Sequence, residues 1–141
     1  MAHFAKIDEN NIVVEVLRID DEFETFGEKY LNDLGFSGRW IQTSYNTHGN
    51  VHHDSTYKIP SNTQHKALRK NYAFVGCTYD ETLDAFIPPK PFDRPSYILD
   101  PETCLWKPPI PEPEPVEGNR WFWAEKEQEW FLVPNIEIQE P

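Results

Sequence analysis

The second half of the chain repeats one motif three times, with two large apolar residues seven positions apart. The copies run from Tyr79 to Phe86, from Leu99 to Trp106 and from Trp123 to Trp130. Acidic and polar residues fill each interval, and prolines follow each copy. Such a pattern is typical of a short β-hairpin with an exposed tip. The repeats therefore predict hairpins that pack or display side chains, which favours a structural or binding role.

The first half predicts further β-structure. Residues 3–19 carry a β-branched run after the turn residues Asp8–Asn11, so they predict an opening hairpin. Residues 40–45 predict a strand. Residues 46–66 are rich in Asn, His, Ser and Thr without periodicity, and they predict a long loop that a partner could stabilise.

One segment changes to helical periodicity. Its apolar residues are Phe23, Phe26, Tyr30, Leu31 and Leu34. This spacing predicts an amphipathic helix near residues 21–34, with Asp20 or Asp21 as its cap and Gly35 as its end. Gly27 lies inside the helix and lowers its propensity slightly.

Prolines divide the chain near its end. They occupy alternate positions within residues 107–118, where they remove backbone donors and favour an extended polyproline spacer. The predicted organisation is a main β-rich domain over residues 1–106, this spacer, a terminal hairpin over residues 119–134 and an acidic tail over residues 135–141. The expected fold class is mainly β with one amphipathic α-helix, repeated β-hairpins and a polyproline spacer.

Charge is unevenly distributed along the chain, whose formal net charge is -11. Residues 1–35 carry a net charge of -6, residues 36–75 one of +4 and residues 76–141 one of -9. The overall acidity argues against nucleic acid as a partner. The basic side chains of Lys66, Arg69 and Lys70 could dock on an acidic neighbour, including a second copy. They could equally form a solvated patch paired with the protein's own acids.

Catalytic or metal-binding patterns are weak. His48, His52, His53 and Asp54 lie close together in sequence, but a Gly/Asn-rich loop gives them no scaffold for converging on an ion. Acidic pairs fall at hairpin tips and in the first helical turns, where acids are favoured structurally. We therefore expect no metal, no cofactor and no enzymatic activity.

The two cysteines have no spacing typical of a metal site or redox motif. Cys77 and Cys104 also occupy different positions relative to their hairpin repeats. We expect reduced thiols in partly buried strands, with a disulfide as the open alternative.

Neither end nor middle of the chain suggests a membrane protein. The first residues lack the apolar core of a signal peptide, and no apolar run is long enough to span a bilayer. We expect a protein made in the cytoplasm, with no membrane partner.

Three tryptophans in or just before the last repeat allow two interpretations. Trp121, Trp123 and Trp130 could form a platform on which sugars stack. Alternatively, Trp123 and Trp130 form a cross-strand pair that holds a short hairpin together, which we favour because such hairpins depend on these pairs.

Several stretches resemble a family of small proteins encoded by marine tailed phages, notably cyanophages. These are residues 40–47, 68–73, 79–92 and 99–106, including the run Phe86-Ile87-Pro88-Pro89-Lys90-Pro91-Phe92. The family is described as uncharacterised or structural, so the resemblance implies a virion setting and supplies no catalytic residue. The Pro-Glu segment 111–115 and the residues after Pro134 are longer than the family pattern.

These observations predict a non-enzymatic virion protein, foremost a decoration or cement protein on the capsid exterior. In this hypothesis the basic segment contacts the shell, and the acidic hairpins face solvent. Its partners would be the major capsid protein, other virion proteins or itself. The alternative is a tail or neck accessory protein, an adhesin whose exposed aromatics touch host glycan.

Overall fold

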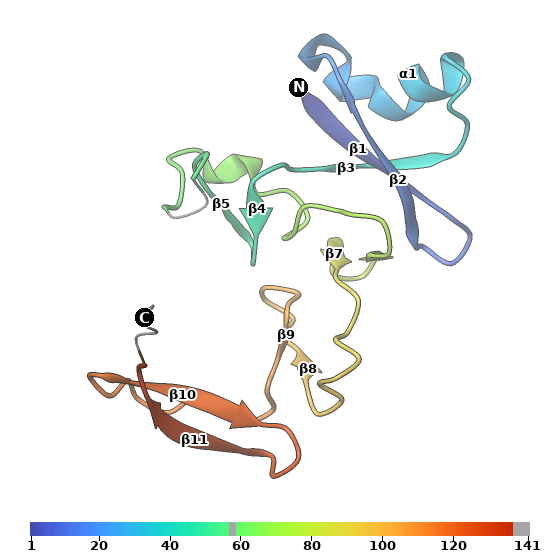
Figure 1. Cartoon of the computed structure of the whole chain (residues 1–141). Helices are drawn as coiled ribbons and strands as arrows, with labels where there is room; N and C mark the ends of the chain where they lie inside the picture. The colour runs from blue at the N-terminus through green and yellow to red at the C-terminus, as the bar shows by residue number, and fades with distance from the viewer. Residues whose placement is uncertain (57–58, 137–141) are drawn as a thin grey trace, which may run out of the picture. The chain divides into compact units, whose positions relative to one another are not determined.

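The computed structural model describes residues 1–56 and 59–136 and is mainly β, which confirms the predicted fold class. Small antiparallel hairpins make up most of its regular structure (Figure 1). The chain divides into two compact units. Among the described residues, the first contains Met1–Pro89 and Leu99–Leu105, and the second contains Lys90–Ile98 and residues 106–136.

A three-stranded antiparallel sheet forms the centre of the first unit. Its strands are β1 (Ala2–Ile7), β2 (Val13–Ile19) and β3 (Arg39–Thr43), in the order β2-β1-β3. The predicted opening hairpin is thus confirmed. Its turn is fixed by Asp8, whose Oδ1 atom accepts hydrogen bonds from the backbone N–H groups of Asn10 and Ile12.

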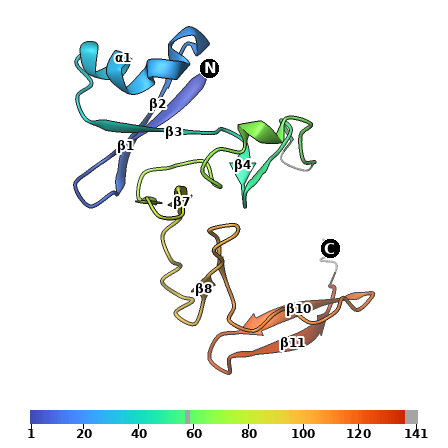
Figure 2. The same ribbon diagram turned by 180° about the vertical axis from the view of Figure 1, so that it is seen from behind.

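The predicted helix is confirmed, although its first part is a 3₁₀-helix. The 3₁₀ segment η1 (Asp21–Phe26) leads directly into α1 (Gly27–Asp33), which lies alongside the sheet (Figure 2). Asp20 occupies the N-terminal cap position, but its side chain makes no capping hydrogen bond. The chain leaves the helix at Gly35, whose φ of 98° is a conformation that glycine tolerates.

The helix is attached to the sheet by packing and by hydrogen bonds. Leu31 is 2% exposed and belongs to a buried cluster with Ala2, Phe4, Ile19 and Trp40. The Glu28 carboxylate accepts a hydrogen bond from the backbone N–H of Trp40 at 2.9 Å. Gly27 allows the ring of Phe4 to approach the helix, because a Cβ atom there would lie 2.2 Å from Phe4 Cζ.

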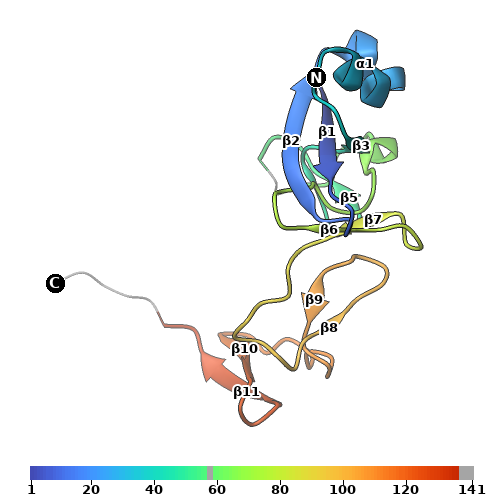
Figure 3. The same cartoon turned by 90° about the vertical axis from the view of Figure 1, so that its right-hand side faces the viewer.

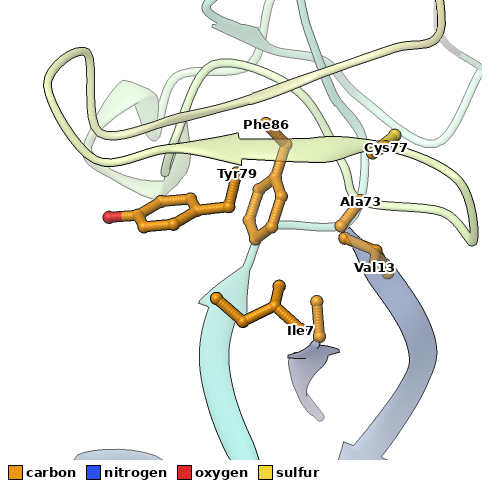
Figure 4. Close-up of a cluster of buried hydrophobic side chains, with 7 residues drawn as sticks. Ile7, Val13, Ala73, Cys77, Tyr79 and Phe86 are labelled. Atoms are coloured by element: carbon orange, nitrogen blue, oxygen red, sulfur yellow. The ribbon is translucent and has the colours of Figure 1, made fainter. Parts of the chain in front are cut away.

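The first repeat packs against the end of this sheet where the turn between β1 and β2 lies. Its hairpin consists of β6 (Thr78–Asp80) and β7 (Ala85–Ile87), and a β-bridge joins Thr78 to Ile12 (Figure 3). The ring of Phe86 extends from the hairpin toward Ile7 (Figure 4). The buried cluster around it contains Ala5, Ile7, Val13, Ala73, Cys77, Tyr79 and Phe86.

The three sequence repeats adopt the same kind of turn. The other two hairpins pair β8 (Ile98–Leu99) with β9 (Trp106–Lys107) and β10 (Asn119–Ala124) with β11 (Glu129–Pro134). The sixth residue of each repeat has a positive φ: 48° at Asp84, 53° at Cys104 and 52° at Gln128. The repeat in sequence is therefore a repeat in backbone conformation.

Residues 46–66, which we expected to be a loop, contain three short elements in their described part. These are β4 (Thr47–His48), β5 (Val51–His52) and the 3₁₀ turn η2 (Gln64–Lys66). The strands β4 and β5 pair with each other. Tyr57 and Lys58 lie outside the described residues.

A buried asparagine connects several segments of the first unit. Asn71 is 3% exposed, and its Oδ1 atom accepts a hydrogen bond from the backbone N–H of Gly49 at 2.8 Å. Its Nδ2 atom donates to the backbone oxygens of Phe86 and Thr103, at 3.1 and 2.9 Å. One side chain thus satisfies backbone groups from three separate stretches of chain.

Both cysteines are free and fully buried. We expected them to lie in strands, and this prediction is wrong for both. Cys77 directly precedes β6, and Cys104 occupies the positive-φ position of its turn. Burial raises the pKa of each thiol, although the Lys70 charge acts in the opposite direction on Cys104. The thiols are therefore protonated and shielded at neutral pH.

Candidate functional site

Two members of the predicted basic segment are used inside the first unit. The guanidinium of Arg69 forms an ion pair with Asp84, with 3.1 Å between Nε and Oδ1, and donates a second hydrogen bond to the backbone oxygen of Gln42. The Lys70 ammonium donates to the backbone oxygen of Pro101 at 2.6 Å. Both basic residues also have positive φ values, 54° and 66°. Their charges therefore stabilise the fold and offer less to an external partner.

Lys66, the third member, is exposed and lines a cavity of about 940 Å³ in the first unit. Side chains from separate elements surround this cavity. They include His3 from β1, Glu24 from η1, Gln42 from β3, Tyr45 after β3, His52 from β5 and His65 from η2. Its lining combines aromatic, acidic, amide and basic groups.

Three rings form an aromatic cluster beside this cavity. The ring of Tyr45 stacks on His3, with centroids 5.4 Å apart and an interplanar angle of 18°. Tyr72 meets both rings edge-on, at 5.6 Å from His3 and 5.3 Å from Tyr45. Tyr45 nevertheless remains 51% exposed. Burial, together with the positive charges of the N-terminus and Arg18, lowers the pKa of His3, so its imidazole is neutral at pH 7.

His52 is held in place through both its imidazole and its backbone. Its Nδ1 atom lies 2.6 Å from Ser61 Oγ, and its backbone exchanges two hydrogen bonds with the side chain of Gln64. Burial lowers the pKa of His52, and the positive charges of Lys66, His53 and His65 lower it further. Lys66 therefore supplies a permanent positive charge on this side of the cavity.

An amide and a carboxylate form a pre-arranged pair in the same cavity. Gln42 Nε2 donates a hydrogen bond to Glu24 Oε1 at 2.9 Å. The hydrogen bond joins β3 to η1 and is exposed to solvent. The amide and the carboxylate together offer donors and acceptors to a hydroxyl-rich ligand.

The histidine-rich stretch does not form a metal centre within residues 1–56 and 59–136. No group of three His, Cys, Asp or Glu side chains there could hold an ion. His52 instead contacts Ser61, and His48 belongs to a different strand from His52.

In the second unit, two tryptophan indoles donate hydrogen bonds to the protein's own backbone. Trp123 and Trp130 form a cross-strand pair with centroids 5.3 Å apart. The indole N–H of Trp130 donates to the backbone oxygen of Ile110 at 2.8 Å, and that of Trp121 donates to the backbone oxygen of Glu114 at 2.9 Å. The proline-rich spacer therefore runs beside the hairpin, and these indoles already have acceptors.

The third indole belongs to a small polar cluster. Glu125 accepts hydrogen bonds from the indole N–H of Trp123, at 2.8 Å, and from the backbone N–H and hydroxyl of Ser96. Partial desolvation acts to raise the pKa of Glu125, but these hydrogen bonds and the nearby Arg94 charge outweigh it and lower the pKa. Trp123 is 4% exposed, so its ring is a packing element.

The opposite face of the terminal hairpin carries two exposed rings. Phe122 and Phe131 are directly paired across β10 and β11, with 45% and 41% of their surfaces exposed. Their pairing follows from the register that also pairs Trp123 with Trp130. The sequence analysis named the tryptophans and missed these phenylalanines, although strand alternation alone places them on the face away from Trp123.

Sequence reasoning also missed most of the cavity. His3, Gln42 and Tyr45 have no characteristic spacing relative to His52 or Lys66, because their proximity depends on how separate elements pack. Only the exposed basic character of Lys66 was a local signal.

Comparisons with known families, with characterised proteins and with solved structures found no match to this chain. Among the described residues, no helix is both long and apolar enough to cross a membrane.

Proposed function

We propose that this chain is a non-enzymatic structural protein of a phage virion, foremost a decoration or cement protein on the capsid exterior. The observation that carries the proposal is the threefold use of one acidic hairpin, in which two large residues flank a turn that carries an exposed acid. Glu81, Glu102 and Glu127 are exposed at the three tips. Repeated scaffolding of this kind supports attachment and display, and the resemblance of the sequence to small phage proteins supports a virion setting.

The internal use of Arg69 and Lys70 changes how such a protein would attach. These two charges are neutralised or hydrogen-bonded within the fold, so a purely electrostatic anchor would depend on Lys66. We therefore favour attachment through exposed apolar and polar side chains over attachment through the basic segment. The partners in this proposal are the major capsid protein, other virion proteins or a second copy.

The decisive experiment measures the copy number of the chain in purified particles, by quantitative mass spectrometry against the major capsid protein. A simple fraction of the capsid protein's copy number is expected for a decoration protein. Absence from washed particles would contradict any virion role.

A second candidate is a tail or neck accessory protein that contacts host glycan. The exposed Tyr45 beside a polar cavity favours it, whereas the bonded indoles of Trp121 and Trp130 do not. A copy number of only a handful per particle would select this candidate over decoration.

A further inference from the structure

The cavity of the first unit is lined by side chains of several chemical types. Its lining includes a half-exposed tyrosine, a hydrogen-bonded amide–carboxylate pair and an exposed lysine. Its volume of about 940 Å³ lies within the range of small-molecule sites. We propose that this cavity binds an acidic saccharide, with one sugar ring against Tyr45 and the sugar carboxylate near Lys66. This inference does not depend on where the protein resides in a particle.

The aromatic cluster supplies the contact for the sugar ring. One face of Tyr45 is covered by His3, yet 51% of the side chain stays exposed, so the ring can still be approached. Tyr72 supports both rings from the edge, which limits their movement. A rigid aromatic surface is suited to the apolar face of a pyranose, because it buries area with little loss of side-chain entropy.

The hydroxyl groups of a sugar need both donors and acceptors. The carboxylate of Glu24 can accept from hydroxyls, and Gln42, bonded to it at 2.9 Å, holds its orientation. An inorganic anion would be repelled by Glu24 and would make no use of Tyr45. An apolar ligand would leave the polar groups of the cavity without partners, which is costly.

The charges of the cavity favour an acidic sugar over a neutral one. Acidic side chains come from η1, which contributes Asp21 and Glu24, whereas the ammonium group of Lys66 comes from η2. Asp21 is already paired with the N-terminal ammonium at 2.9 Å. A ligand with hydroxyls at one end and a carboxylate at the other matches this division.

The test compares galacturonic acid with galactose, which differ at C6 alone, by ligand-observed NMR titration of the full chain. Both sugars should bind, and the acid should bind up to about fivefold more tightly, the upper range for an exposed ion pair. Lys66→Gln should remove this preference and leave galactose binding unchanged. Lys126→Gln, at an exposed lysine in the second unit, is the matched charge control.

The aromatic contact is tested separately. Tyr45→Ala should weaken both sugars about tenfold, whereas Phe74→Ala, at a ring with similar exposure of 49%, should change neither. Glu24→Gln preserves the size of the side chain and should weaken galactose, but it should weaken galacturonic acid less, because it also removes a charge that repels the acid. Failure of either sugar to saturate, or equal binding by Tyr45→Ala and the unchanged chain, would overturn the proposal. So would competition by inorganic phosphate combined with no galactose binding, since that result defines a simple anion site.

Discussion

Replacing Gly27 by alanine should destabilise the protein, although alanine is the better helix former. The added Cβ atom would lie 2.2 Å from Cζ and 2.4 and 2.7 Å from the two Cε atoms of Phe4. Phe4 is 5% exposed and packs in one cluster with Leu31 and Trp40, so its ring has little room to withdraw. The helix therefore needs glycine here for close approach.

Two opposing terms set the magnitude. Alanine gains up to about 1 kcal/mol of helix propensity over glycine, and overpacking a filled core costs roughly 1–3 kcal/mol. Because the clash involves three ring atoms, we expect the upper part of that range and a net loss of about 1–2 kcal/mol. This loss lowers Tm by roughly 4 °C or more for a unit of about one hundred residues.

The assay is thermal unfolding followed by circular dichroism, in a double-mutant cycle with Phe4→Leu. Leucine lacks the ring atoms that meet the new Cβ, so Gly27→Ala should cost less in that background. An unchanged or higher Tm for the single variant would refute the close-approach argument. An equal cost in both backgrounds would show that the loss does not come from Phe4.

Three further perturbations test other parts of the fold. Asn71→Ala should lower the free energy of unfolding by about 3 kcal/mol in urea titrations, since it leaves several buried backbone groups unpaired. The lowered pKa of Glu125 implies stability that is present above its usual value of 4.5 and lost as pH falls through the folded pKa. Glu125→Gln should therefore flatten the acid dependence of tryptophan fluorescence, whereas an unchanged acid transition would contradict this linkage. Gln128→Gly should raise Tm by relieving a positive φ, but Asp84→Gly should lower it through loss of the Arg69 ion pair; equal shifts would contradict this contrast.

Elements with local periodicity could be predicted from sequence. The hairpin over residues 3–19, the helix near residues 21–34 and the three repeats each rely on residues close in the chain. Local spacing encodes which face is apolar and where a turn falls, so no long-range information was needed. The same reasoning placed the helix end at Gly35, where φ is positive.

Features that depend on distant contacts could not be predicted. The role of Gly27 depends on Phe4, which lies on another element. From the sequence alone, Gly27 could be interpreted only as a weak helix former. No local sequence pattern marks Asn71 as important. Its side chain stabilises the fold by hydrogen bonds to the backbone of Gly49, Phe86 and Thr103, which are distant in sequence. For the same reason the sequence left open whether the charges at residues 69 and 70 serve a partner or the protein's own acids, and the fold pairs Arg69 with Asp84.

The three repeats have the same positive-φ backbone conformation in different surroundings. The positive-φ position is occupied by Asp84, Cys104 and Gln128, and none of these is the glycine that the conformation favours. Asp84 accepts hydrogen bonds from Arg69 and Tyr79, Cys104 is completely buried, and Gln128 is exposed. The contacts of Asp84 and the burial of Cys104 can offset the backbone strain of a positive φ, whereas the exposed Gln128 has no such compensation. The three repeats therefore share the turn conformation and the flanking pair of large residues. The side chain at the positive-φ position differs between repeats and makes different contacts in each. A protein built in this way can change what each hairpin contacts without changing how the hairpin folds.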